Sequence, residues 1–506
     1  MEFGTIQSIF RDKYALLFSF LILVIELTIA GLDQIGDFGN YYFGSMFLLE
    51  GNFDLWVYDP GKFNLELVRR GWEGLFLNYT PVPPITALFY LPFTLFNIAT
   101  AKFFFNLIGA IVLLVSLSRL IKHLKLNAWV LAIIPLLFFQ ALVSNFQQGQ
   151  AYLFIAAMMM EGFIAWEKQR FWVSAILWSL PISLKIFPGV VLLFLLQRRD
   201  IVQVFRIIII GALVFSVSLV WISFNVWTEY VVDILPRLMK GEINNPYSTI
   251  YQSFSVFLKK LFVYDSLLNP NPAVSVQELY FFLDPIFKLS AIAVFWSICS
   301  RMRDAFFGFS IFLFLSFLIS GYGSTYGLLF LIPITLFVFQ NLSMVKGWIM
   351  LLVLFLLINL PVGLFGSLPL IAQFPRLILL LILAGILIYL FPFKISNRKA
   401  WIGICILLVL LNFSSKRDQS SLVTYEGNKL LSIEFWATDS GLAVVNFDGE
   451  LDTTFIPMQI VSQRKISDSE VEDAHDLLLL NHHDLYFLSD RNRGVGFYAV
   501  RKLEWE

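Results

Sequence analysis

The chain has 506 residues, of which 58% are hydrophobic and only 14% are charged, and its mean hydropathy is +0.76. A soluble protein of this length would carry roughly a quarter charged residues, so the composition excludes an ordinary soluble enzyme and indicates a membrane-embedded protein. Basic and acidic residues are equal at 36 each, which gives no reason to expect a nucleic-acid partner. The two cysteines, Cys299 and Cys405, lie in separate apolar segments, so neither a disulfide framework nor a Cys-x-x-Cys metal site is expected.

The first apolar run covers residues 14–32 and follows Arg11 and Lys13. Its length and the lack of a clear small-x-small cleavage site favour a retained membrane span over a cleaved signal peptide. A span needs about 20 apolar residues, or fewer where the helix faces protein. The candidate spans are 14–32, 103–118, 128–144, 151–166, 206–224, 283–299, 305–320, 327–341, 347–363, 376–392 and 400–413.

Two further apolar segments decide the topology, because basic loops of membrane proteins lie in the cytoplasm. Residues 81–98 open with three prolines and contain Pro92, which predicts an interfacial or re-entrant helix that does not cross. Residues 171–196 have basic residues at both ends, which predicts two half-helices with Lys185 at their apex. All basic clusters then share the cytoplasmic side: 11–13, 119–125, 168–170, 198–199, 301–303, 346 and 394–399.

The sequence therefore predicts an all-α polytopic protein of the inner or plasma membrane, with about 13 transmembrane helices and one interfacial helix. The N-terminus is expected in the cytoplasm and the C-terminus outside. Residues 1–413 would form the membrane domain, with a first outer loop and juxtamembrane helices at 33–102 and a second large loop at 225–282 that is amphipathic near 249–264. The polar tail, 414–506, has short alternating runs bounded by Gly, Asp and Asn, which predict a small β-rich extracytoplasmic domain.

Acidic residues recur in the first outer loop, and Asp37 lies a few residues past the first span. A carboxylate at that interface is partly desolvated and can still reach an acceptor hydroxyl. The simpler interpretation is that Asp37 caps a helix that begins at Phe38. Tyr41 and Tyr42 follow it, and such tyrosines usually belong to an interfacial aromatic belt.

Lys185 lies between two apolar half-helices, where a lysine is costly unless it meets an anion or water. The phosphate of a lipid carrier would supply that anion. The alternative is a structural ion pair with an intramembrane carboxylate such as Glu26. On the outer side, the polar turn 144–150 and the segments 244–254 and 320–326 offer neutral groups suited to sugar hydroxyls or phosphate oxygens, although each is also typical of a solvated loop.

Several motifs of other enzyme classes are absent from the sequence: a Walker loop, Gly-x-Gly-x-x-Gly and His-Glu-x-x-His. The tail contains His475, His482 and His483, but neighbouring histidines on a loop are weak evidence for a metal site. We therefore expect no cofactor and no dependence on a divalent metal.

The order and spacing of several motifs resemble a known family. Asp37-Phe-x-x-Tyr-Tyr, Gly51, Tyr58-Asp59-Pro60 and Tyr79-x-Pro81 are similar to the opening of GT-C fold glycosyltransferases. Three further motifs extend the similarity over residues 33–260: Gln148-Gly-Gln150, Lys185-Ile-Phe-Pro188 and Tyr251-Gln-Ser-Phe254. The pattern resembles glycosyltransferase family 87, which includes polyprenyl-phosphate-mannose-dependent mannosyltransferases and related arabinofuranosyltransferases.

This resemblance implies a GT-C membrane fold that transfers a mannose-like hexose or a pentose from a polyprenyl-phosphate sugar to a lipid or polysaccharide acceptor on the outer face. It implies that Asp37 is the catalytic base and that Lys185 lies near the donor phosphate. The candidate substrate-binding side chains are Lys185, Gln148, Gln150, Tyr41, Tyr42, Tyr79, Asn245, Gln252, Ser253, Tyr322 and Tyr326.

The turn at 320–326 departs from the family, whose members often have a proline, a tryptophan and histidines there, and the tail 414–506 is not a recognised part of the family core. Two other function classes stay open. A flippase or transporter of lipid-linked sugars would also need an intramembrane cation and broken helices, but not the acidic first loop. A non-catalytic assembly protein would bind its partner through the tail.

Overall fold

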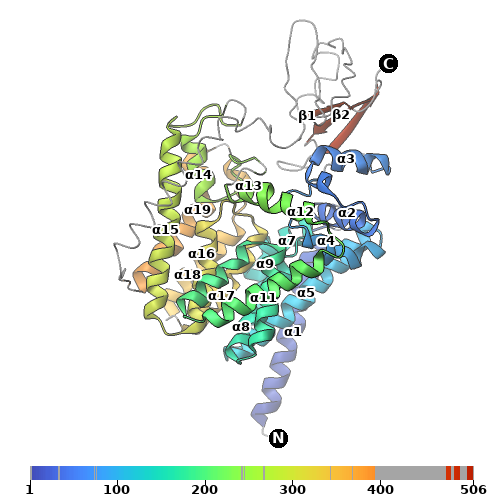
Figure 1. The fold of residues 1–506 in the computed structure, drawn as a ribbon. Coiled ribbons are helices and arrows are strands. Elements are labelled where there is room, and N and C mark those ends of the chain that lie inside the picture. Colours follow the sequence, from blue (N-terminus) through green and yellow to red (C-terminus); the bar gives the residue numbers. More distant parts are fainter. Residues whose placement is uncertain are drawn as a thin grey trace.

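The computed structural model describes the backbone of residues 3–31, 35–72, 75, 77–240, 243, 245–265, 268–341, 344–366, 368–391 and 393, and of three strands in the tail. The part up to residue 393 is a bundle of helices (Figure 1). By length and composition, the helices that could cross a membrane are α5 (Ile98–His123), α11 (Ile201–Ser218), α15 (Gln277–Arg301) and the bent pair α6 (Val130–Leu137) and α7 (Phe139–Gln148). These apolar helices confirm a mostly helical membrane protein, while the count of about 13 crossings stays a prediction.

The other helices of the bundle mostly overlap the predicted spans, although the first begins at Phe3 instead of residue 14 and the short helix Leu370–Gln373 lies between two predicted spans. They are α1 (Phe3–Ile29), α8 (Tyr152–Glu167), α9 (Phe171–Leu184), η3 (Phe187–Gly189), α10 (Val190–Gln197), α16 (Ala305–Ile319), η5 (Tyr326–Leu331), α17 (Ile332–Asn341), α18 (Met344–Asn359), η6 (Val362–Phe365), η7 (Leu370–Gln373) and α19 (Pro375–Leu390). The predicted span 206–224 is wrong at its end, because α11 stops at Ser218 and the Ser223 side chain accepts from Val226 N to start the next helix. The span predicted at 400–413 lies outside the described residues.

The apolar segment 171–196 is broken at Lys185, as predicted. α9 ends at Leu184, and α10 begins five residues after Lys185. The beginning and the end of this segment lie close together. Gln203 Nε2 donates to the carbonyl of Phe171 at 2.9 Å, and Trp166 Nε1 donates to Asp200 Oδ2 at 2.9 Å. The chain therefore returns to the end of the bundle from which it started, with Lys185 at the turning point.

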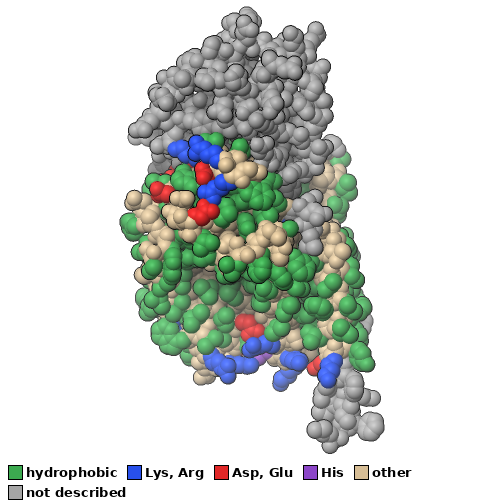
Figure 2. Space-filling view, turned by 90° about the vertical axis from the view of Figure 1, so that its right-hand side faces the viewer, with side chains coloured by type: hydrophobic (Ala, Val, Ile, Leu, Met, Phe, Trp, Pro, Cys, Tyr) green, Lys and Arg blue, Asp and Glu red, His purple; other side chains and the backbone are tan. Residues whose placement is uncertain are grey.

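Basic clusters from distant parts of the chain meet at one end of the bundle. Arg198 donates to the carbonyl of Arg303 at 2.9 Å, and His123 Nε2 lies 2.5 Å from Glu167 Oε2. Figure 2 shows lysine and arginine side chains along the end from which the N-terminal helix projects. The clusters at 119–125, 168–170, 198–199 and 301–303 thus share a side, as the distribution of positive charge predicted. The cluster at 394–399 lies outside the described residues, and the assignment of the shared side to the cytoplasm stays a prediction.

The opposite end carries the elements of the two long loops (Figure 1). They are α2 (Phe38–Leu49), η1 (Leu55–Tyr58), α3 (Pro60–Arg69), α4 (Ile85–Tyr90), η2 (Leu91–Leu95), α12 (Phe224–Glu229), η4 (Tyr230–Ile234), α13 (Leu235–Lys240) and α14 (Phe254–Phe262). The proline-rich segment forms only α4 and η2, which are together too short to span a bilayer. The amphipathic stretch of the second loop forms α14, which packs on α15.

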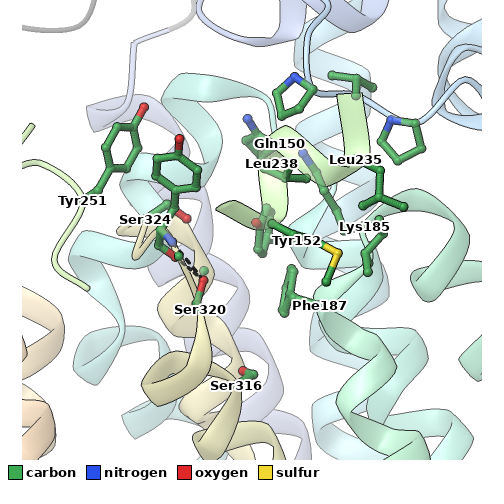
Figure 3. A pocket seen from close by; sticks show the side chains of 18 of the residues that line it. Gln150, Tyr152, Lys185, Phe187, Leu235, Leu238, Tyr251, Ser316, Ser320 and Ser324 are labelled. Carbon is green, nitrogen blue, oxygen red and sulfur yellow. Dashed lines mark hydrogen bonds between the residues drawn. The ribbon is translucent and has the colours of Figure 1, made fainter. Parts of the chain in front are cut away.

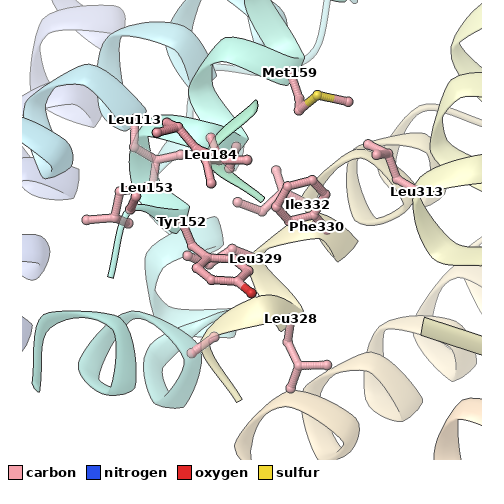
Figure 4. Packing of buried hydrophobic residues seen from close by; sticks show 14 of the residues in the cluster. Leu113, Tyr152, Leu153, Met159, Leu184, Leu313, Leu328, Leu329, Phe330 and Ile332 are labelled. Carbon is pink, nitrogen blue, oxygen red and sulfur yellow. The ribbon is translucent and has the colours of Figure 1, made fainter. Parts of the chain in front are cut away.

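One hydrophobic cluster joins the helices of the bundle beneath these loops. Figure 4 shows part of it, where Leu113, Leu153, Leu184 and Phe330 from four elements gather around Tyr152. Tyr152 is 8% exposed, so its side chain is buried in this cluster.

The described part of the tail is a three-stranded antiparallel sheet in the order β1 (Ala474–Leu479), β2 (Asp484–Ser489) and β3 (Ala499–Glu504). Leu477 pairs with Phe487, which pairs with Arg501 on its other side. The rest of 414–506, including His482 and His483, lies outside the described residues, so the predicted β-rich domain stays untested.

Candidate functional site

A cavity of about 1080 Å³ lies at the loop-bearing end of the bundle (Figure 3). Its walls come from segments far apart in the sequence: 35–41, 75–83, 150–152, 185–193, 230–239, 285–292 and 316–327. Among the described residues, three charged side chains line it, those of Asp37, Lys185 and Lys288. In Figure 3, Gln150, Tyr152 and Lys185 lie on one side, and Tyr251, Ser320 and Ser324 lie on the other.

Asp37 directly precedes α2, which begins at Phe38 as predicted, but the predicted capping role is wrong because its side chain makes no cap hydrogen bond. The carboxylate instead turns to the end of α7, where Gln150 Nε2 donates to Asp37 Oδ2 at 2.6 Å. The Asp37 backbone N–H donates to Gln148 Oε1 at 3.2 Å. Among the described residues, Gln150 is the side chain that donates to this carboxylate, so Oδ1 is left to accept a further hydrogen bond.

A chain of hydrogen bonds leads from Lys185 to Asp37. Lys185 Nζ donates to the Tyr41 hydroxyl at 3.3 Å, and this hydroxyl donates to Gln150 Oε1 at 2.6 Å. Because the ammonium can only donate, the tyrosine must pass its own proton on, which fixes the orientation of the Gln150 amide. Each donor therefore points toward the Asp37 carboxylate, and bonds aligned in this way polarise one another.

Two glycines allow this close approach of α2 to the end of α7. Gly36 has a φ of +56°, and a Cβ there would lie 2.6 Å from the carbonyl oxygen of Gln147. Gly149 ends α7 in the left-handed conformation with a φ of +59°, and a Cβ there would lie 2.5 Å from Phe38 Cβ. Any larger residue would push Asp37 away from Gln150.

The polar segment 144–150 joins α7 to α8, but it is helical as far as Gln148, so only its last residues form the turn. The last carbonyls of a helix lack partners within the helix. Here buried side chains from other elements donate to these carbonyls. Lys102 Nζ donates to the carbonyl of Gln147 at 2.6 Å, and Asn106 Nδ2 donates to that of Phe146 at 2.9 Å. The Tyr90 hydroxyl donates to the carbonyl of Gly149 at 3.1 Å. These contacts stabilise the extra turn and fix the direction in which the chain leaves toward Gln150.

Lys185 is surrounded by aromatic rings. Its Nζ lies 5.5 Å from the ring centroid of Tyr41 and 5.9 Å from that of Tyr152, which is the range of a cation–π contact. The alternative ion pair with Glu26 is wrong, because among the described residues neither carboxylate oxygen of Glu26 has a hydrogen-bond partner. The lysine therefore lines the cavity and is not held by a structural carboxylate in the first helix.

Burial raises the pKa of the Asp37 carboxyl above its ordinary value, while the hydrogen bond from Gln150 and the charges of Lys185 and Lys102 oppose that rise. Burial likewise raises the pKa of Tyr41 well above its usual range, so its hydroxyl stays protonated and can donate to Gln150. A carboxylate with a raised pKa is a stronger proton acceptor than an ordinary aspartate.

The turn at 320–326 forms the wall opposite Asp37. Tyr326 packs on Tyr152 with ring centroids 4.9 Å apart, and the Tyr322 hydroxyl donates to the carbonyl of Ile243. The buried guanidinium of Arg376, which does not line the cavity, stabilises this turn, because its Nη1 donates to Thr325 Oγ1 at 2.5 Å. Both predicted tyrosines of the turn therefore line the cavity.

Six of the predicted site residues do not line the cavity: Tyr42, Tyr79, Gln148, Asn245, Gln252 and Ser253. The Tyr42 hydroxyl donates to the carbonyl of Phe96 at 2.8 Å, and the buried Tyr79 ring packs against α2 at Gly44. Gln252 links backbone groups, since its amide donates to Gln373 O at 2.9 Å and accepts from Arg376 N at 3.1 Å.

The other members of this group also support the loops around the cavity. The Ser253 hydroxyl caps α14 and donates to the carbonyl of Gly321 at 2.8 Å. Asn245 is exposed, and its side chain accepts from the backbone N–H of Tyr247 at 2.9 Å. These contacts shape the walls of the cavity from outside it.

Sequence reasoning missed Asn40, Tyr152 and Lys288, which line the cavity, and Lys102, which supports it. Two of them carried a signal, because a lysine within or beside an apolar helix is expensive and is usually functional. Lys102 stands just before the predicted span 103–118, and Lys288 lies inside the predicted span 283–299. Tyr152 carried none, since aromatic residues are common at the ends of membrane spans.

Within the described residues, no group of three or more His, Cys, Asp and Glu side chains could hold a metal ion. No curated protein and no solved structure matches the chain. The sequence profile described as glycosyltransferase family 87 matches residues 79–321, which include Gln150, Lys185 and Lys288. The resemblance predicted from the motifs is thereby confirmed: over residues 79–321 the chain is similar to glycosyltransferase family 87, which implies a glycosyltransferase.

Proposed function

We propose that this chain transfers a mannose-like hexose or a pentose from a polyprenyl-phosphate sugar to a lipid or polysaccharide acceptor on the non-cytoplasmic side of the membrane. The observation that carries the proposal is the hydrogen-bond chain from Lys185 through Tyr41 and Gln150 to Asp37 inside one large cavity. It brings a proton acceptor and a cation into the same space, as transfer from a phosphate leaving group requires.

In the proposed reaction, the acceptor hydroxyl attacks the anomeric carbon of the donor sugar and its proton moves to Asp37. The bond between the anomeric carbon and the phosphate oxygen breaks, and its electron pair leaves with the polyprenyl phosphate. Among the described residues Oδ1 of Asp37 has no donor, which suits this proton transfer, because Oδ2 is already held by Gln150. Direct attack on a β-linked donor would invert the anomeric centre.

Lys185 has the complementary role. Negative charge on the phosphate grows as the bond to the sugar breaks, so a fixed cation stabilises the transition state more than the ground state. Tyr41 and Tyr152 hold the ammonium in place through one hydrogen bond and two ring contacts. No step of this scheme needs a metal ion.

The test is transfer by the purified full-length protein in lipid nanodiscs, with radiolabelled polyprenyl-phosphate sugars as donors and with lipid and polysaccharide products separated. Asp37→Asn keeps the size of the side chain but removes the base, so we expect its kcat to fall about 100- to 10,000-fold. Asp54→Asn is the matched control, because Asp54 lies in the same loop and its side chain caps η1 away from the cavity.

Full transfer by Asp37→Asn would exclude this base. In sealed vesicles that hold the same protein, movement of the labelled lipid across the bilayer without any glycosylated product would instead identify a flippase. A protein that needs residues 414–506 but not Asp37 would fit the assembly role.

A further inference from the structure

A second lysine reaches the cavity from a different element. Lys288 lies in the middle of α15, and its Nζ is 2.7 Å from Asp284 Oδ2 one turn earlier. The other oxygen of that carboxylate, Oδ1, accepts from Ser255 Oγ in α14 at 2.5 Å. Both oxygens of Asp284 are therefore engaged, and the carboxylate is 10% exposed against 22% for the lysine side chain. The pair is thus oriented with its cation toward the cavity.

The position of Lys288 within α15 indicates which face it serves. The cavity-lining residues of this helix are Pro285, Lys288, Leu289 and Ile292, whose spacing of three, four and seven residues places them on one face. Lys288 is the charged member of an otherwise apolar stripe. A charge in the apolar part of a membrane helix is expensive and usually marks a ligand path.

This group is built independently of the Asp37 site. Lys185 is tied through Tyr41 and Gln150 to Asp37, whereas Lys288 has its own carboxylate behind it. Among the described residues that line the cavity, the charged side chains are Asp37, Lys185 and Lys288, so two cations face one carboxylate there. An ammonium has three donor hydrogens and Asp284 accepts one of them, so an anion in the cavity can be bound without breaking the ion pair.

We propose that Lys288, oriented by Asp284 and Ser255, is a second phosphate-binding position of the cavity and binds the phosphate of a lipid-linked substrate. The inference rests on the proposed function, since it assumes that the cavity receives phosphate-bearing lipids. The phosphate belongs either to the polyprenyl donor or to a phospholipid acceptor, and an ammonium recognises both in the same way.

The decisive variant exchanges the two charges, Asp284→Lys with Lys288→Asp. It keeps an ion pair at the same helical spacing but turns a carboxylate toward the cavity. If the pair only stabilises α15, the exchanged protein behaves as the wild type. If Lys288 binds phosphate, its affinity for the lipid phosphate falls about 10- to 100-fold, the effect of one charge-assisted hydrogen bond. The neutral pair Asp284→Asn with Lys288→Met gives the same answer should the exchange prevent folding, because removing both charges of a buried pair is usually tolerated.

Binding is measured without turnover, on the full-length protein in nanodiscs, with a long-chain polyprenyl phosphate and with phosphatidic acid as probes. The matching polyprenol and diacylglycerol show what the phosphate itself contributes. Lys346→Met, an exposed lysine of α18 that does not line the cavity, is the control for unspecific attraction of anionic lipids. The melting temperature of each variant reports folding.

Weaker binding of polyprenyl phosphate alone assigns Lys288 to the donor, and weaker binding of phosphatidic acid alone assigns it to the acceptor. Folded variants that bind both probes as tightly as the wild type overturn the proposal. Because no turnover is needed, an active Asp37→Asn protein would refute the proposed base and leave the second phosphate position standing.

Discussion

The Tyr41 hydroxyl donates to Gln150 Oε1 at 2.6 Å and accepts from Lys185 Nζ at 3.3 Å. It therefore connects the Lys185 ammonium to the amide that donates to Asp37. Tyr41→Phe removes this link and keeps the ring that stacks on Tyr90 with centroids 4.6 Å apart. We expect kcat to fall by a factor of a few to about ten, because a buried hydrogen bond contributes about 1 kcal/mol.

The matched control for this variant is Tyr42→Phe, whose hydroxyl bonds to the carbonyl of Phe96 and does not line the cavity. It should lower the melting temperature slightly and leave kcat near the wild-type value. Equal losses of kcat in both variants would show that the chain of hydrogen bonds has no special role.

The pH dependence of transfer reports the environment of Asp37. If Asp37 is the base, it must be ionised, and burial raises its pKa, so we expect activity to fall as the pH drops through a value above the ordinary 3.9 or so of aspartate. Gln150→Leu removes a hydrogen bond that lowers this pKa. The acidic limb of the kcat profile should therefore move to higher pH in this variant. If the acidic limb is unchanged in Gln150→Leu, the group that titrates there is not Asp37.

Gly149→Ala should destabilise the fold by about 1–3 kcal/mol, the usual effect of a side chain forced into the left-handed region, and more if Phe38 cannot move aside. Gly385→Ala in α19 is the control, since a Cβ there meets nothing within 4 Å and alanine favours a helix by about 0.5–1 kcal/mol. Thermal unfolding in detergent compares the two. If Gly149→Ala is as stable as the wild type, the end of α7 can shift to accommodate a side chain at this position.

Glu26→Leu should leave transfer unchanged and keep or raise the melting temperature. Neither carboxylate oxygen of Glu26 has a hydrogen-bond partner among the described residues, and a buried polar group without a partner is destabilising. A thermal shift assay together with the transfer assay checks this. Loss of transfer with normal folding would show that this carboxylate acts in the reaction after all.

The features that could be predicted from the sequence are those with a local cause. The break at Lys185 follows from the prolines around it and from basic residues at both ends of one apolar segment, and the start of α2 at Phe38 follows Asp37 directly. The shared side of the basic clusters follows from charge alone. These features need no knowledge of which helices are neighbours.

The features that could not be predicted depend on tertiary contacts. α7 extends through its polar residues because Lys102, Asn106 and Tyr90 supply donors from other elements. Asp37 is the N-cap residue of α2, but its side chain accepts from Gln150, 113 residues later in the chain, and makes no cap hydrogen bond. Local propensity alone favours the cap and the turn, and the packing of distant segments overrides it.

The hydrogen bonds from Lys102 and Asn106 to the last carbonyls of α7 have a consequence for genetics. Lys102 and Asn106 do not line the cavity, yet they determine where Gln150 points and therefore how Asp37 is held. A screen of random substitutions for inactive but normally inserted protein should thus yield a group of hits on one face of α5. Such alleles would lie on residues that do not line the cavity, so normal insertion would distinguish a loss of activity from a defect in assembly.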